Sequence, residues 1–210
     1  KRMNAPHTEI NSVAILSGGE SRRMGVDKAM LLVDGLPLIE KQVRNVRQAF
    51  GDIPLWMCSG PRRYPTIDHY DVTYLNDALP AGGPLVGIAQ ALHWASPEDG
   101  DEGRVLVIPC DTLIAPDEIY QALSWVPPTP GEVVFLQGQR AHPLHGIYST
   151  ALADAVSGYL AKGGRSVMGF LDGVAVGHVS APAGWESCLN VNSEPDFKLA
   201  LAAFFKLTDS

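Results

Sequence analysis

The sequence has little cysteine, and its three cysteines, Cys58, Cys110 and Cys188, are too far apart to form a CxxC pair. This spacing argues against a disulfide scaffold or a cysteine-rich zinc site and favours a reducing compartment. The sequence also lacks an apolar run of about 18 residues, the length that a transmembrane helix needs. Its first residues lack the apolar segment of a signal peptide. We therefore expect a cytoplasmic protein that does not associate with a membrane.

Positive charge is also scarce, because 16 Lys and Arg stand against 23 Asp and Glu and give a formal net charge of −7. Nucleic acid is itself an anion, so this balance argues against non-specific nucleic-acid binding. Arg22, Arg23 and Lys28 nevertheless follow one another closely near the N-terminus. Concentrated positive charge in an otherwise acidic chain indicates a local site for an anion.

The 210 residues, 46% of them hydrophobic, are enough to bury a sizeable core. Short apolar runs alternate with amphipathic stretches of helical period. We expect strands over residues 13–16, 53–57, 72–75, 104–109, 133–136, 145–148 and 174–179. We expect helices over residues 37–50, 84–95, 116–125, 151–161, 166–171 and 195–205. This alternation predicts an α/β fold with three layers, Rossmann-like, around a mostly parallel central sheet.

The segment from Leu16 to Lys28, LSGGESRRMGVDK, follows the first expected strand. Gly18 and Gly19 let the backbone curl with its N–H groups facing inward, and they allow a ligand to approach closely. Backbone donors and cations at the carboxyl end of a strand suit a polyphosphate. The segment lacks the third glycine of GxGxxG and contains no GxxxxGK[ST], so it is neither of those phosphate loops. The alternative interpretation is a glycine-rich turn followed by a solvated basic segment.

Two aspartates, Asp77 and Asp111, follow expected strands whose carboxyl ends should meet at one edge of the sheet. Mg²⁺ prefers oxygen ligands and needs only one or two carboxylates beside substrate phosphates. Asp111 comes directly after the most apolar strand and is therefore the candidate metal ligand. The alternatives are a turn or helix cap for Asp111 and an Asx turn for Asp77.

The chain resembles the molybdenum cofactor guanylyltransferases, the molybdopterin-guanine dinucleotide biosynthesis protein A family. The resemblance spans residues 12 to about 200, and its motifs occur in the family's order. They are the segment Leu16 to Lys28, Asp77, GPLVG at Gly83 to Gly87, PCDT at Pro109 to Thr112, HPL at His142 to Leu144, RSVM at Arg165 to Met168, and NVN at Asn190 to Asn192. The resemblance implies a nucleotidyltransferase fold, which we expect as one domain over residues 12–206 after a flexible leader over residues 1–11.

The resemblance also implies roles for individual residues. Leu16, Gly18, Gly19 and Lys28 would hold the nucleotide, with Lys28 and Arg22 balancing the triphosphate charge. Asp77 would read the guanine or orient the ribose. Asp111 would bind Mg²⁺, helped by Asn192. The pterin side would be lined by Arg140, His142, Arg165 and Asn190.

The activity that the resemblance implies is Mg²⁺-dependent transfer of GMP from GTP to molybdopterin cofactor, with release of pyrophosphate. Its partners would be these substrates and a molybdoenzyme or cofactor-insertion protein. Cytidylyl transfer to the same cofactor is an alternative, because Cys58 and Ser59 stand where relatives often have asparagine near the base, although the double glycine favours guanine. Glu20 is a second departure and is expected to point outward. A sugar-phosphate nucleotidyltransferase is a further alternative, although this chain is short for one.

Two alternatives belong to other classes of protein. A nucleotide-binding regulator without turnover would not need Asp111 together with Lys28. An NAD-type dehydrogenase is disfavoured by the missing third glycine.

Several candidate residues also have plain structural interpretations. His142 and His145 lie near a strand, where a histidine is more often packed or hydrogen-bonded than catalytic. Cys110 has no basic neighbour in sequence, which favours a buried apolar role over a nucleophile. Arg165 either binds the acceptor phosphate or is a solvated helix start.

Overall fold

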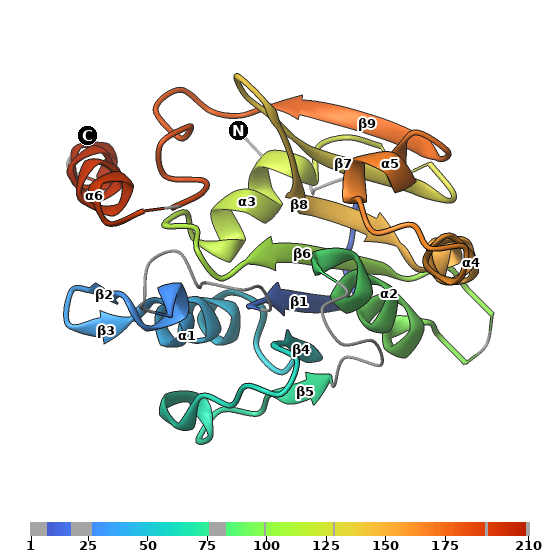
Figure 1. The fold of residues 1–210 in the computed structure, drawn as a ribbon, viewed down its shortest axis with the longest axis horizontal. Helices are drawn as coiled ribbons and strands as arrows, with labels where there is room; N and C mark the ends of the chain where they lie inside the picture. The colour runs from blue at the N-terminus through green and yellow to red at the C-terminus, as the bar shows by residue number, and fades with distance from the viewer. Residues whose placement is uncertain are drawn as a thin grey trace, which may run out of the picture.

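The computed structural model describes residues 8–17, 27–75, 83–98, 100–127, 129–191 and 193–208. Its centre is a seven-stranded sheet of order β5-β4-β1-β6-β8-β7-β9, which runs from the bottom to the top of Figure 1. The strands are β1 (Ser12–Leu16), β4 (Leu55–Cys58), β5 (Thr73–Leu75), β6 (Arg104–Pro109), β7 (Glu132–Gln137), β8 (Ala141–Ser149) and β9 (Ala175–Ser180). The helices are α1 (Leu38–Phe50), α2 (Pro84–Ala95), α3 (Pro116–Leu123), α4 (Ala153–Ala161), α5 (Val167–Leu171) and α6 (Glu194–Thr208).

The sheet is mostly parallel, as the sequence predicts. β1 pairs in parallel with β4 and β6, β4 with β5, and β7 with β9, whereas β8 is antiparallel to both β6 and β7. The predicted fold class is therefore confirmed. None of the described helices is long and apolar enough to cross a membrane.

Alternate residues of the central strands enter two separate cores. Val13 and Ile15 of β1 face the core under α1 and α3, whereas Ala14 and Leu16 face the core under α2, α4 and α5. This is the alternation expected of a strand covered on both faces, and it explains why β1 is an uninterrupted apolar run. Figure 1 shows the helices on both sides of the sheet, which makes the three layers.

The main departure from the predicted elements lies between β7 and β8. The sequence suggests a loop over residues 137–144, but β8 already begins at Ala141. The pairing of β7 with β8 jumps from Leu136↔His142 to Phe135↔Gly146, so residues 143–145 are extra residues on β8. Pro143 has no N–H for a ladder bond, and a bulge is where a strand tolerates proline. The apolar alternation therefore breaks while the strand continues.

Smaller elements also differ from prediction. A two-stranded hairpin, β2 (Leu32–Val33) with β3 (Leu36–Pro37), precedes α1. Among the described residues, 3₁₀ turns occur at η2 (Lys28–Met30), η3 (Pro65–Ile67) and η4 (Thr150–Leu152). Other boundaries shift by a few residues, and α2 and β6 have the predicted bounds.

Gly87 in α2 is a point of close approach between the helix and the sheet. A Cβ on Gly87 would lie 2.8 Å from Cys58 Cβ and 3.2 Å from Leu16 Cδ2. We expect Gly87→Ala to lower the free energy of unfolding by about 1–3 kcal/mol, because both neighbours are fixed in strands. Gly158 in α4 is the matched control, since a Cβ there meets no atom within 4 Å.

Gly158→Ala should raise the free energy of unfolding by about 0.4–1 kcal/mol, because alanine lowers the entropy of the unfolded chain. Equilibrium urea denaturation measures both changes. An unchanged stability in Gly87→Ala would contradict the packing described for α2.

Candidate active site

The site is organised around one ion pair at the carboxyl edge of the sheet. β1 and β6 are neighbours, and their last residues, Leu16 and Pro109, are paired. The backbone N–H of Cys110 donates to the Leu16 carbonyl at 2.9 Å, which fixes the turn that carries Asp111. Lys28 Nζ lies 3.2 Å from Asp111 Oδ2, although the two residues are 83 positions apart. The structure thus brings together two residues that the sequence predicts for the site.

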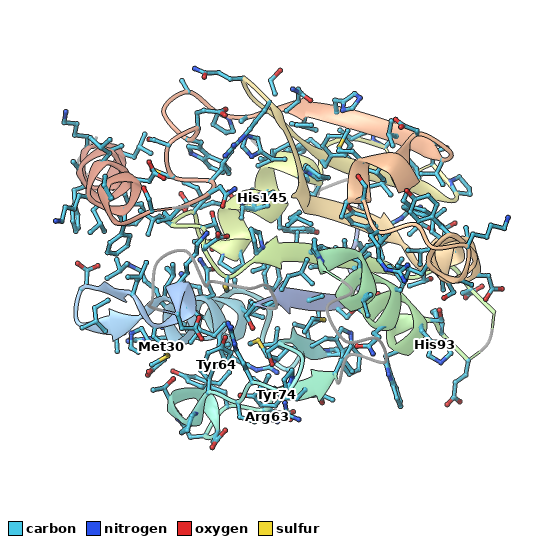
Figure 2. All side chains as sticks on the ribbon, viewed as in Figure 1. Met30, Arg63, Tyr64, Tyr74, His93 and His145 are labelled. Carbon is cyan, nitrogen blue, oxygen red and sulfur yellow. The ribbon has the colours of Figure 1, made fainter. Side chains whose placement is uncertain are left out.

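Lys28 is positioned by the residue before it. The Asp27 carboxylate accepts a hydrogen bond from the Ala29 backbone N–H at 3.1 Å and so caps η2. The Tyr64 hydroxyl donates to Asp27 Oδ2 at 3.3 Å, and Arg62 Nη1 lies 3.5 Å from the same oxygen. Burial raises the pKa of Tyr64 to about 12, so its hydroxyl stays a donor at neutral pH. Figure 2 shows Tyr64 close to Arg63 and Tyr74, below α1.

The negative charge of the Asp111 carboxylate is only partly compensated by the groups around it. Its side chain is only 16% exposed. Burial raises the pKa of Asp111 above the ordinary value for aspartate, and Lys28 offsets this effect only in part. A buried anion whose charged form is still disfavoured provides a favourable position for a further cation.

A cavity of about 460 Å³ opens beside Asp111. Because β8 is antiparallel to β6 and β7, its amino end lies at the edge where those strands have their carboxyl ends. The cavity is lined by residues of this strand end, of the α5 start and of two loops, among them Asp111, Arg140, His142, His145, Ser166, Met168 and Asn190. Arg140, His142 and Asn190 therefore lie together, as predicted for the acceptor side.

Asn190 is held beside Asp111 by backbone pairing. The Val191 N–H donates to the Asp111 carbonyl at 3.0 Å, and the Leu113 N–H donates to the Cys188 carbonyl at 2.9 Å. Asn190 and Val191 are thus held against the PCDT turn. Sequence order alone does not reveal this pairing.

The two histidines of the cavity differ in their partners. His142 Nε2 lies 3.1 Å from Glu186 Oε1, and Glu186 Oε2 also accepts from the Gln139 N–H at 3.0 Å. Since a carboxylate only accepts, Nε2 of His142 carries a proton. Neither ring nitrogen of His145 makes a hydrogen bond with the described residues. No feature of the sequence identifies Glu186 as a site residue, because its contact with His142 joins two segments that are distant along the chain.

The remaining predicted site residues fall into two groups. Leu16 is a core residue whose carbonyl takes part in the β1–β6 junction, and Arg165 is not among the residues that line the cavity. The Arg165 guanidinium donates to the carbonyls of Leu160 and Gly164 at 2.9 and 2.6 Å. Gly18, Gly19, Arg22, Asp77 and Asn192 lie outside the described residues.

Cys110 is buried, as expected, and burial raises the pKa of its thiol. The thiol therefore stays protonated at neutral pH and is a poor nucleophile. Cys58 and Ser59, which depart from the family pattern, make hydrogen bonds to backbone. Cys58 Sγ donates to the Gly87 carbonyl at 3.4 Å and Ser59 Oγ to the Arg62 carbonyl at 2.8 Å.

A mostly parallel three-layer sheet with a lysine–carboxylate pair at its carboxyl edge, beside a cavity lined by both polar and apolar side chains, has the architecture of a nucleotide-binding transferase. Comparison with known proteins agrees with this class. A family model described as "MobA-like NTP transferase domain" matches residues 13–175. The chain belongs to this family.

Named relatives extend the similarity over most of the chain. A probable molybdenum cofactor guanylyltransferase of Synechococcus elongatus is 36% identical over 77% of this chain and 84% of its own length. A molybdenum cofactor guanylyltransferase of Cereibacter sphaeroides is 32% identical over 89% of this chain and 93% of its own. The crystal structure of molybdopterin-guanine dinucleotide biosynthesis protein A from Archaeoglobus fulgidus superposes with a TM-score of 0.69, 20% identity, and coverage of 93% and 99%. This neighbour shares the fold.

The electrostatics of Asp111 predict that one substitution lowers activity and raises stability. We expect Asp111→Asn to lower turnover at least about a hundredfold, because the charged carboxylate that would hold the divalent cation is lost. The same change should stabilise the protein at pH 7.5. Folding raises the pKa of Asp111 above its unfolded value, so its charged form costs stability at neutral pH, and this cost fades as the pH falls toward about 4.

Initial rates and thermal melting at several pH values measure the two effects of Asp111→Asn. Asp34→Asn is the matched control, because Asp34 also pairs with a lysine, Lys41, but is 59% exposed. It should change neither property appreciably. Near-normal turnover of folded Asp111→Asn at saturating Mg²⁺ would contradict the role assigned to this carboxylate.

Proposed function

We propose that this protein transfers GMP from GTP to molybdopterin cofactor and releases pyrophosphate. The observation that carries the proposal is the Lys28–Asp111 pair, in which the last residue of the predicted nucleotide segment contacts a carboxylate that lines the cavity. The relatives named above as molybdenum cofactor guanylyltransferases support the choice of both substrates.

The reaction needs neutralisation of charge more than it needs a base. An oxygen of the acceptor's phosphate forms a bond to the α-phosphorus of GTP, while the bond from that phosphorus to the bridging oxygen of pyrophosphate breaks. The attacking phosphate is already an anion, so no proton has to be removed from it. Lys28 would stabilise the charge that develops on pyrophosphate, together with the Gly18–Gly19 loop and Arg22.

Asp111 suits a divalent cation. Among the described residues, no group of three or more His, Cys, Asp or Glu side chains could hold a metal by itself. Asp111, assisted by Asn192, would therefore share Mg²⁺ with the substrate phosphates, as this ion prefers. When bound, Mg²⁺ would neutralise phosphate charge as a Lewis acid. The Asp111 carboxylate is a buried anion whose charge is only partly compensated, which fits the role of a cation ligand.

The acceptor would occupy the cavity beside Asp111. Arg140, His142 and Asn190 would contact the pterin side, and Asp77 would contact the base or ribose of GTP. The product would pass to a molybdoenzyme or to a cofactor-insertion protein. All three cysteines are buried thiols, which agrees with action in a reducing compartment such as the cytoplasm.

Calorimetric titration with GTP, CTP and ATP, each with and without Mg²⁺, tests the nucleotide. We expect Mg²⁺-dependent preference for GTP, followed by pyrophosphate release once molybdopterin cofactor is added. CTP is included because the side chains of Cys58 and Ser59 are engaged with backbone carbonyls, so neither provides the amide of the family's asparagine. A clear preference for CTP would overturn the assignment of guanine.

Lys28→Met tests the phosphate contact. We expect turnover to fall about a hundredfold or more, because the methionine keeps the length of the side chain and removes the charge. Lys162→Met is the matched control, since Lys162 is exposed after α4 and lines a different cavity. Pyrophosphate release at saturating substrates measures both variants, and equal rates for the two would contradict the proposed role of Lys28.

A further inference from the structure

One polar side chain of the cavity has no role in the site described so far. His145 lines the cavity wall and is only 2% exposed. Neither Nδ1 nor Nε2 makes a hydrogen bond with the described residues. The Leu189 backbone lies near the ring, but no atom reaches hydrogen-bond geometry. Buried polar groups without partners are rare in proteins, and each one calls for an explanation.

The bulge in β8 explains how His145 comes to face the cavity. Residues 143–145 are the extra residues of the β7–β8 pairing, and regular pairing resumes at Gly146. A bulge next to a site redirects the side chains of the strand. The ring stands edge-on to His142, with 5.8 Å between the ring centres. Figure 2 places His145 near β6 and β8.

The imidazole of His145 is neutral. Burial, with smaller contributions from His142 and Arg140, lowers the pKa of His145 to about 3. One ring nitrogen is therefore a donor and the other an acceptor. An uncharged donor and acceptor cannot neutralise a phosphate, so His145 differs from Lys28 in the kind of group that it suits. The complementary group is the uncharged, hydrogen-bonding edge of a heterocycle.

We infer that His145 is a specificity-determining residue that hydrogen-bonds the uncharged heterocycle of the acceptor. The inference deepens the proposed function and rests on it for the identity of the acceptor. A pterin ring presents amide and amino groups along one edge, which offer both donors and acceptors to a neutral imidazole. His142 differs, because its Nε2 is already engaged by Glu186. His145 is thus the cavity histidine for which the protein supplies no partner among the described residues.

Two substitutions of His145 distinguish a role in binding the acceptor from a role in the stability of the fold. His145→Leu has similar volume but no polar atom, and His145→Asn keeps one donor group and one acceptor. Ile147→Val is the matched control, because Ile147 is the next residue of β8 on the same face and lies in the core instead of the cavity wall. It reports any general effect of altering this strand.

We expect His145→Leu to raise the acceptor KM about tenfold or more at saturating GTP, with the GTP KM unchanged. His145→Asn should keep most of the acceptor affinity. The ligand-free His145→Leu protein should melt at a higher temperature than wild type, because a buried unpaired polar group is removed. Ile147→Val should melt slightly lower and keep the acceptor KM. A merely structural histidine would give lower melting in His145→Leu with the acceptor KM unchanged, which would overturn the inference.

Direct binding of a pterin distinguishes this inference from the proposed function. Quenching of 6-hydroxymethylpterin fluorescence should show binding to wild type and at least about tenfold weaker binding to His145→Leu. If wild type fails to bind GTP or to transfer the nucleotide but binds the pterin through His145, the proposed function fails and the inference holds. If transfer proceeds and His145→Leu binds the pterin as wild type does, the inference fails and the proposed function stands.

Discussion

The ion pair between Lys28 and Asp111 is the interaction on which the rest of the site depends. Because β1 and β6 pair in parallel, both strands end at the same edge of the sheet. The hydrogen bond from the Cys110 N–H to the Leu16 carbonyl fixes the turn that follows β6. Asp27 then directs Lys28 to that point, with Tyr64 and Arg62 holding Asp27. One lysine does not fully compensate the buried carboxylate. The fold therefore places an under-compensated anion where a metal and phosphates would meet.

The reversed direction of β8 supplies the other half of the site. In an all-parallel sheet, the residues before a strand lie at the edge opposite the ligand. Because β8 is antiparallel, its amino end and the bulge at residues 143–145 lie at the ligand edge. The cavity is thus built largely by one irregular strand, together with the start of α5 and the segment that carries Asn190. The irregularity shapes the cavity, and bulges are often found beside active sites.

Local chemistry made much of this structure predictable. β6 (Arg104–Pro109) and α2 (Pro84–Ala95) have their predicted bounds, because an apolar run and a proline at a helix start are local signals. Lys28, Asp111 and Asn190 are brought to one region as expected. Glu186 and Tyr64 could not be predicted, since their partners come from distant turns. Arg165 is a cation of a family motif whose guanidinium donates to the carbonyls of Leu160 and Gly164, and sequence alone does not indicate these contacts.

Asp111 and His145 are two buried polar groups that lack full compensation, and both line the same cavity. Such groups cost stability when nothing binds them, so their presence beside one cavity supports the proposal that ligands complete the site. Their needs differ, because Asp111 lacks positive charge whereas His145 lacks a neutral hydrogen-bonding partner. A divalent cation at Asp111 would meet the first need, and the uncharged heterocycle of the acceptor would meet the second. An acceptor held in this way would direct its phosphate toward Lys28 and the cation at Asp111, where the α-phosphate of the nucleotide would be attacked.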